Sequence, residues 1–364
     1  MVGRHSGSLE LFVLATGQDD NLGDVVLRRE FFDRLRAVGN LNVFVGESSG
    51  DFIDGLCLKD TDTVYRSLRQ WHSAAWRSLT SAQVWYVDKP GELQLDSRTL
   101  RRQVKLLPLL LVIRLSGGQV LRLGMAMRAG NRLPLRALRV LFRLSTMVCW
   151  RDTLSSKAFG YGVVGPDWAF RRDCAPQPIA SERSYIAITY RGDREKPSAQ
   201  ILDALRAMSR DRNWRLVVVT QVRRDSARSL ELASHLGAEL APWPEERSVA
   251  EQEAVLRDIY RRSALVVSDR LHALIIGMAE GAVPLCITDT GEPKVGRHFD
   301  AIGFASSTAN LHEAGGTLAE LMELQILRRD EALQALEAAQ ARLDGVSAEL
   351  LSLSIESRDG NYCL

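Results

Sequence analysis

Residues 264–294 constrain the fold more than any other part of the chain. The apolar run 264–267 has the length and composition of a buried strand, a helical segment follows it, and 283–287 is a second apolar run. Strand, turn, helix and strand in this order predict a parallel βαβ unit. Because parallel sheets are covered by helices on both faces, the stretch predicts an α/β fold.

The turn of this unit carries polar side chains suited to an anion site. Ser268 and Asp269 follow the first strand, and Asp269 is expected to be the N-cap of the helix. Arg270 and His272 would then lie in the first helical turn, where free N–H groups favour anions. An always-charged guanidinium beside an imidazole that titrates near neutrality indicates a phosphate or carboxylate site where a proton is transferred.

The rest of the chain repeats the alternation of strand and helix in two halves. A helix is expected over 62–78, and the proline-containing stretch 171–184 has linker composition. We therefore expect two Rossmann-like, doubly wound domains facing each other across a cleft, at 1–175 and 176–325, with a helical tail at 326–364. Strands are expected at 9–16, 41–45, 83–87, 119–125, 146–150, 185–190, 216–220, 264–267 and 283–287.

The tail has a capping box, Thr317 with Glu320, and a narrow leucine stripe. Leu336, Leu343 and Leu350 recur every seven residues. A stripe of so few heptads is typical of a helix that packs back on its own domain, and a homodimer contact is the alternative.

The net charge of +2 conceals a basic segment, since residues 98–151 contain twelve Lys or Arg and no Asp or Glu. Arg136, Arg139 and Arg143 would share one face of a helix that begins near Pro134. Two interpretations are equally open: a solvated helix face, or a surface for anionic lipid head groups or a lipid diphosphate. Nucleic acid is disfavoured because no aromatic interleaving or binding motif accompanies the arginines.

Five cysteines are scattered without CxxC spacing, and neither zinc, EF-hand nor P-loop patterns occur. Scattered cysteines of this kind predict a protein of a reducing compartment, and we therefore expect a cytoplasmic protein. If the basic helix binds lipid, the protein would be peripheral at the inner face of the membrane. No apolar run approaches the length of a membrane span, and no signal peptide is expected.

Two further motifs lie at expected strand ends. In Asn21-Leu-Gly-Asp24, Gly23 permits a tight turn and Asp24 is expected to cap the next helix. In Arg151-Asp-x-x-Ser155, Arg151 would stand at the carboxyl end of a strand, either at the site or paired with a nearby carboxylate.

These motifs together, with Ser268-Asp-Arg-Leu-His272 and Lys294 behind them, resemble the polysaccharide pyruvyl transferase family from Asn21 to about Gly303. The resemblance implies a fold like that of the GT-B glycosyltransferases, with phosphoenolpyruvate as co-substrate and neither cofactor nor metal. The acceptor would be a sugar unit of a cell-surface polysaccharide or lipid-linked oligosaccharide, which the sequence does not name.

The chemistry of phosphoenolpyruvate is compatible with roles for single residues. Arg151, Arg270 and Lys294 would hold the phosphate and carboxylate of phosphoenolpyruvate, and His272 would protonate its methylene carbon. Asp24 and Asp269 would orient these groups and the sugar or cap helices only. The remaining residues expected to bind substrate are Asn21, Gly23 and Ser268.

Two alternatives remain open at this point. One is a GT-B nucleotide-sugar glycosyltransferase, although the only candidate for an acidic donor motif, Gly291-Glu-Pro293, fits poorly. The other is a non-catalytic, glycan-binding relative, supported by the loop 88–91, where the family usually has a run of glycines.

Overall fold

The computed structural model describes residues 8–128, 132–171, 183–289, 293–305, 307–310 and 317–359. Contacts between residues divide the chain into two compact units. Unit 1 combines Met1–Gln18, Leu27–Trp168 and Ala341–Leu364, and unit 2 combines Asp19–Val26 and Ala169–Gln340. The short segment that carries Asn21 therefore packs with the second half of the chain.

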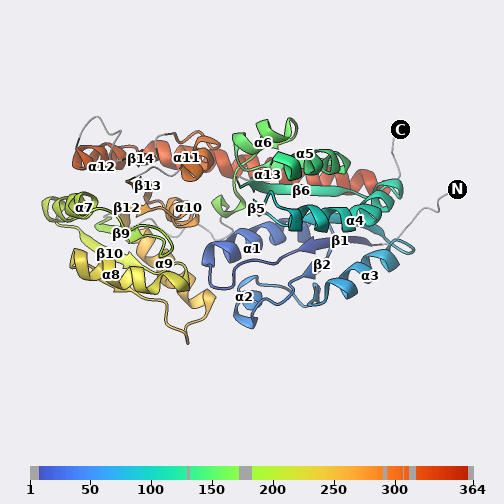
Figure 1. Ribbon diagram of the computed structural model, residues 1–364, viewed down its shortest axis with the longest axis horizontal. Coiled ribbons are helices and arrows are strands. Elements are labelled where there is room, and N and C mark those ends of the chain that lie inside the picture. Colours follow the sequence, from blue (N-terminus) through green and yellow to red (C-terminus); the bar gives the residue numbers. More distant parts are fainter. Residues whose placement is uncertain are drawn as a thin grey trace. The chain divides into compact units, whose positions relative to one another are not determined.

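Unit 1 is built on a parallel sheet with the strand order β3-β2-β1-β4-β6-β7-β8, in which β5 pairs with β6 (Figure 1). The inner strands β1, β4, β6 and β7 are mostly buried, as expected for a sheet covered on both faces, whereas the edge strands β3 and β8 are partly exposed. The elements are β1 Leu9–Leu14, α1 Leu22–Arg36, β2 Asn40–Phe44, α2 Gly50–Gly55, β3 Thr63–Tyr65, α3 Leu68–Ser78, β4 Gln83–Asp88, β5 Gly91–Leu93, α4 Ser97–Leu115, β6 Val120–Met127, α5 Arg132–Leu141, a 3₁₀ helix Phe142–Leu144, β7 Met147–Trp150, α6 Thr153–Phe159, β8 Val163–Val164 and a 3₁₀ helix Trp168–Phe170.

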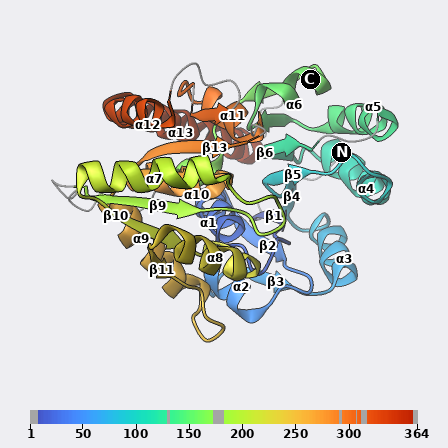
Figure 2. The same ribbon diagram turned by 60° about the vertical axis from the view of Figure 1, so that its left-hand side comes forward.

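Unit 2 holds a second parallel sheet, with the strand order β11-β10-β9-β12-β13-β14. Helix α7 packs against α8 and α12, and α9 packs against α10, so the sheet is doubly wound as expected (Figure 2). The elements are β9 Tyr185–Thr189, α7 Ala199–Arg212, β10 Arg215–Val219, a 3₁₀ helix Arg223–Asp225, α8 Ser226–Leu236, β11 Glu239–Ala241, α9 Val249–Arg262, β12 Ser263–Ser268, α10 Leu271–Ala279, β13 Val283–Thr288, α11 Pro293–Asp300, β14 Thr308–Asn310, α12 Leu318–Leu327 and α13 Arg329–Asp359.

The loop that follows β4 is fixed by buried polar contacts. Asp88, which is 1% exposed, pairs with Arg122 of β6 and accepts a hydrogen bond from Gln103 Nε2 of α4 at 3.0 Å. Lys89 Nζ donates to the carbonyl oxygen of Thr16 at 2.7 Å. The charged side chains of this loop therefore tie three strands together.

One expectation about helices changes with the structure, and another is confirmed. The helix expected over 62–78 is wrong in its first part, because β3 extends the sheet there and the helix begins only at Leu68, capped by Ser67. The capping box of Thr317 and Glu320 is confirmed at the start of α12. In α13, Leu343 and Leu350 are at most 1% exposed, so the leucine stripe packs on this chain.

Among the helices of the described residues, none has both the length and the hydropathy needed to cross a bilayer.

Candidate functional site

Basic side chains follow four neighbouring strands of unit 2 at the edge where the strands end. Since β9, β10, β12 and β13 are parallel, their carboxyl ends lie on the same edge of the sheet, where ligands of such folds bind. We call this group the basic edge: Arg191 and Arg194 after β9, Arg223 and Arg224 after β10, Arg270 after β12 and Lys294 after β13.

Arg270 is held by a buried carboxylate. It occupies the N-cap position of α10, and its Nε and Nη2 atoms contact Asp225 Oδ2 in the loop after β10. Arg270 is 9% exposed and Asp225 0%, and burial lowers the pKa of Arg270, although the guanidinium stays charged. Asp225 Oδ1 also accepts from Gly192 N at 2.8 Å, so one carboxylate joins the loops after β9, β10 and β12.

Asp269 does not cap α10, and this expectation is wrong. Its Oδ1 accepts from the backbone N of Arg191 at 2.9 Å, and Arg194 lies 3.8 Å from its Oδ2. The backbone N of Arg270 instead donates to Ser268 Oγ at 2.8 Å. Burial raises the pKa of Asp269, because the hydrogen bond and the nearby arginines offset only part of the cost of removing the carboxylate from water.

The loop Asn21–Asp24 belongs to the same unit as Arg270. Asn21 forms an antiparallel bridge with Val222, which precedes the basic residues after β10. The Oδ1 atom of Asn21 accepts from Gly23 N at 3.1 Å at the start of α1. Helix α1 begins at Leu22, so Asp24 lies in its first turn, and the expectation that Asp24 caps the helix is wrong.

Gly23 lies directly against His272, the second residue of α10. A Cβ atom built on Gly23 would stand 2.4 Å from His272 Cβ and 2.5 Å from its Nδ1, so no larger residue fits without a shift. The side chain of His272 is half-buried. Two motifs about 250 residues apart in the sequence therefore meet at the imidazole.

One of the expected site residues does not belong to unit 2. Arg151 follows β7 of unit 1, is 2% exposed and pairs with Asp167, which is the alternative that the sequence left open. Asp152 caps α6, accepting from Ser155 N at 2.6 Å. Lys294 lies in the first turn of α11, and its carbonyl oxygen is 2.7 Å from His298 Nδ1.

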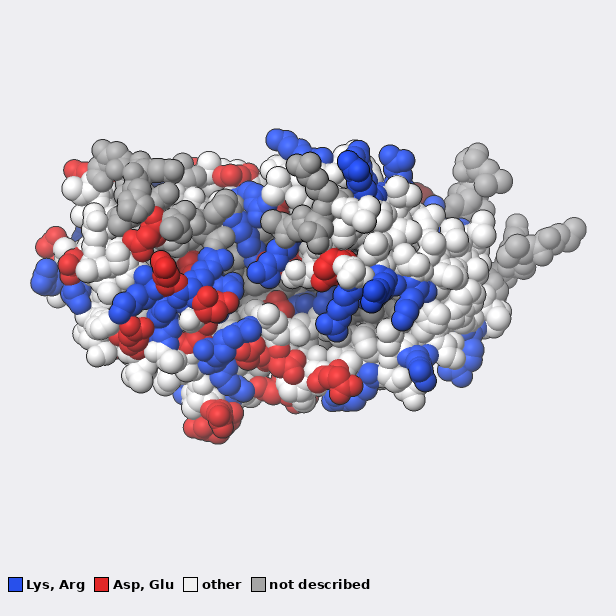
Figure 3. All heavy atoms as spheres, viewed as in Figure 1, with Lys and Arg blue, Asp and Glu red and all other residues white. Residues whose placement is uncertain are grey.

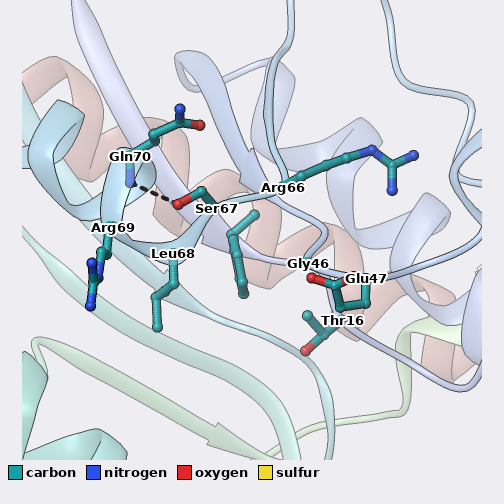
Figure 4. A pocket seen from close by; sticks show the side chains of 9 residues that line it. Thr16, Gly46, Glu47, Arg66, Ser67, Leu68, Arg69 and Gln70 are labelled. Atoms are coloured by element: carbon teal, nitrogen blue, oxygen red, sulfur yellow. Dashed lines mark hydrogen bonds between the residues drawn. The ribbon is translucent and has the colours of Figure 1, made fainter.

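Unit 1 has a pocket of about 670 Å³ at the carboxyl ends of β1, β2 and β3. Figure 4 shows Thr16, Glu47 and Arg66 among its lining residues, with Ser67 accepting from Gln70 N. Phe44 supplies an aromatic wall, and Arg69 adds a second guanidinium. Hydroxyl, amide and charged groups beside an aromatic ring suit a polar ligand such as a sugar.

No group of three or more His, Cys, Asp or Glu within the described part of the chain is arranged to hold a metal ion.

The sequence pattern of the polysaccharide pyruvyl transferase family matches residues 21–289. The chain belongs to this family. It is therefore a transferase. The matched range begins at Asn21, includes Arg151 and Ser268 to His272, and ends before Lys294. No curated protein matches the chain significantly.

Solved structures show the same GT-B-like fold as this pyruvyl transferase family member. Anabaena Alr3699/HepE in complex with UDP and glucose has a TM-score of 0.52 at 12% identity, covering 98% of this chain and 99% of its own. A Listeria monocytogenes protein assigned as a UDP-N-acetylglucosamine 2-epimerase has a TM-score of 0.52 at 13% identity, covering 98% and 97%. Phytolacca americana UGT2 has a TM-score of 0.50 at 12% identity, covering 96% and 99%. At this identity the likeness shows the fold alone.

Asp225 and the first four members of the basic edge were not predicted from the sequence of this pyruvyl transferase family member. A usable signal was present, because arginines occur within four residues after both β9 and β10. The pairing of Asp225 with Arg270 left no such signal, since the two are 45 residues apart in the sequence.

Proposed function

We propose that the chain transfers the enolpyruvyl group of phosphoenolpyruvate to two hydroxyls of one sugar unit, forming a pyruvate ketal and releasing phosphate. A proton adds to the methylene carbon, a sugar oxygen bonds to the adjacent carbon, and the bond from that carbon to the phosphate oxygen breaks. The second hydroxyl then closes the ketal. The two hydroxyl protons balance the one taken up by the methylene and the one that leaves with phosphate.

The contact of Gly23 with His272 is the observation that supports this proposal most directly. It places a group that can carry a proton near neutral pH beside the arginine that follows β12. In the proposed mechanism His272 gives its proton to the methylene carbon, and a hydroxyl proton restores it. Gly23 and Asn21 hold the loop against the imidazole.

The basic edge supports phosphoenolpyruvate as the donor, because this substrate carries a phosphate and a carboxylate on three carbons. Arg270, oriented by Asp225, is the proposed ligand of the phosphate. Arg194 and Lys294 are proposed to bind the carboxylate or to stabilise the departing phosphate. Asp269 and Ser268 position the loops that carry these cations, through their bonds to backbone N–H groups.

We further propose that unit 1 binds the acceptor, a sugar unit of a cell-surface polysaccharide or of a lipid-linked oligosaccharide. The pocket lined by Thr16, Phe44 and Glu47 has the aromatic and hydrogen-bonding groups that sugars require. Arg151 of the same unit is buried against Asp167, so no contact with the substrate is proposed for it. A cytoplasmic location agrees with the free thiols of Cys57, Cys149 and Cys286.

Phosphate release from phosphoenolpyruvate, measured with a panel of glycan acceptors, tests the proposal. His272→Ala should lower acceptor-dependent release by about 10²- to 10⁴-fold, the usual range for a general acid. His235→Ala, which removes an exposed imidazole from α8 of the same unit, is the matched control and should leave the rate unchanged. Full activity of His272→Ala would contradict its role as the acid.

Thermal stabilisation by ligands separates this proposal from its alternatives. Phosphoenolpyruvate should raise the melting temperature of the native protein, and less so in Arg270→Lys, because an ammonium cannot reproduce the guanidinium fork. A nucleotide sugar that stabilises the protein while phosphoenolpyruvate does not would favour glycosyl transfer. Stabilisation by glycans alone would favour a non-catalytic glycan-binding protein.

A further inference from the structure

Helices α4 and α5 of unit 1 pack against each other and expose apolar and basic side chains together. We call their solvent side the α4–α5 face. It contains Arg101, Val104, Lys105, Leu111 and Leu115 of α4, Leu133, Arg136, Arg139 and Val140 of α5, and Arg143 of the adjoining 3₁₀ helix. Figure 3 shows Lys and Arg side chains beside uncharged surface in this region.

The exposed apolar side chains are not needed for the core. Leu115 is 82% exposed, Leu133 74% and Val140 65%. The core side of this region is already supplied by Leu138 of α5 and Phe142 of the adjoining 3₁₀ helix, both fully buried. Large apolar side chains grouped on one surface of a protein mark an interaction site more often than chance exposure.

The positions of these residues repeat with the period of a helix. Along α5, Leu133, Arg136, Val140 and then Arg143 alternate apolar and basic at intervals of three and four residues. Along α4 the same side of the helix is basic in its first half and apolar in its last turns, ending at Leu115. Helices that lie in the surface of a membrane combine arginine with apolar residues in this way.

The charge of the face has one sign. No acidic residue occurs in the sequence between 98 and 151. In the described residues Arg101, Lys105, Arg136 and Arg139 have no ion pair, whereas Arg122 inside the same unit is neutralised by buried Asp88. The exposed cations are therefore available for an anionic partner.

We propose that the α4–α5 face binds the surface of a bilayer that contains anionic lipids. An isologous contact with a second copy would place like charges against each other. The negative surface of such a bilayer attracts the cations of the face. The apolar layer beneath that surface accommodates Leu115, Leu133 and Val140. Binding is peripheral, and it brings the chain to the surface where lipid-linked substrates reside.

Co-sedimentation with vesicles tests this proposal. The native protein should bind vesicles of phosphatidylcholine with phosphatidylglycerol, bind phosphatidylcholine alone poorly, and dissociate from the mixed vesicles as salt is raised. Arg136→Glu with Arg139→Glu should weaken binding at least about 30-fold, the equivalent of about 2 kcal/mol for two basic residues. Leu133→Ser with Val140→Ser should weaken binding even at low salt.

Matched changes on another surface provide the controls. Leu324 and Leu327 of α12 are 64% and 76% exposed, so Leu324→Ser with Leu327→Ser removes similar apolar area without touching the face. All variants should keep the native melting temperature, because the altered side chains are exposed. Failure of the native protein to bind mixed vesicles, equal binding to both vesicle types, or undiminished binding by the charge-reversed variant would each overturn the proposal.

Discussion

Gly23→Ala is the sharpest test of the site, because it adds one methyl group where two motifs touch. The added Cβ would lie 2.4 Å from His272 Cβ and 2.6 Å from its Cγ, where ordinary contacts are 3.4–4 Å. Rotation of the imidazole cannot relieve a clash with its own Cβ. Either the loop at Asn21 or the start of α10 must therefore move by about 1 Å.

A displacement of about 1 Å in a catalytic group can cost about 10²-fold in rate. We expect this loss in phosphate release from phosphoenolpyruvate, together with a decrease of about 1–3 kcal/mol in stability from overpacking. The intrinsic preference of helices for Ala over Gly, about 1 kcal/mol, opposes the second effect and makes the loss of activity the clearer readout.

Gly345→Ala is the matched control for this substitution. Gly345 also lies within a helix, α13, and a Cβ added there meets nothing within 4 Å. The same methyl group should raise stability by up to about 1 kcal/mol and leave the rate unchanged. If Gly23→Ala were as active as Gly345→Ala, the imidazole held by Gly23 would not be the acid of the reaction.

Three further predictions concern the contacts around the basic edge and the tail. Asp225→Asn should lower the unfolding free energy by about 3–5 kcal/mol, because it leaves Arg270 buried without a counter-charge, and it should weaken stabilisation by phosphoenolpyruvate in a thermal melt. Arg191 holds the pKa of Asp193 down at about 2, so the ion pair stabilises the fold above the ordinary carboxyl pKa of 3.8 and is lost as pH falls towards about 2. Urea unfolding should thus show Asp193→Asn less stable than the native protein at neutral pH by at most about 1 kcal/mol, since the pair is at the surface, and equally stable near pH 2. Leu343→Ala should cost about 2–5 kcal/mol in the same assay without changing the oligomeric state in sedimentation, because Leu343 is buried within the chain.

The sequence predicted the architecture because it depends on local patterns, and the candidate site residues were chosen from local patterns too. Apolar runs of strand length between helical segments are sufficient to predict parallel sheets, and β12 with α10 follows the expected unit closely. Arg270 and His272 were predicted because they follow a strand directly. Such patterns are read over a few residues, and no distant contact is needed to interpret them.

The two wrong expectations about helix caps concern positions where more than one group can form the hydrogen bond. Asp269 is a good N-cap residue by type, yet its carboxylate accepts from the backbone N–H of Arg191 in the loop after β9, and Arg270 occupies the N-cap position instead. At the start of α1, Asn21 takes the place expected for Asp24: it forms the bridge with Val222, and its side chain accepts from Gly23 N. Both outcomes depend on which strands are neighbours in the sheet. The residues next to Asp269 or Asp24 in the sequence do not contain that information.

The cations alone do not decide between the candidate reactions. Phosphoenolpyruvate and a nucleotide sugar are both anionic, so a row of arginines at the carboxyl edge of a sheet would serve either donor. The reactions differ in the proton, because transfer of a pyruvyl group requires protonation of a carbon atom and therefore a fixed acid beside the cations. His272, in contact with Gly23 and two residues after Arg270, is the proposed acid, and the response of phosphate release to Gly23→Ala therefore tests pyruvyl transfer more directly than any arginine variant.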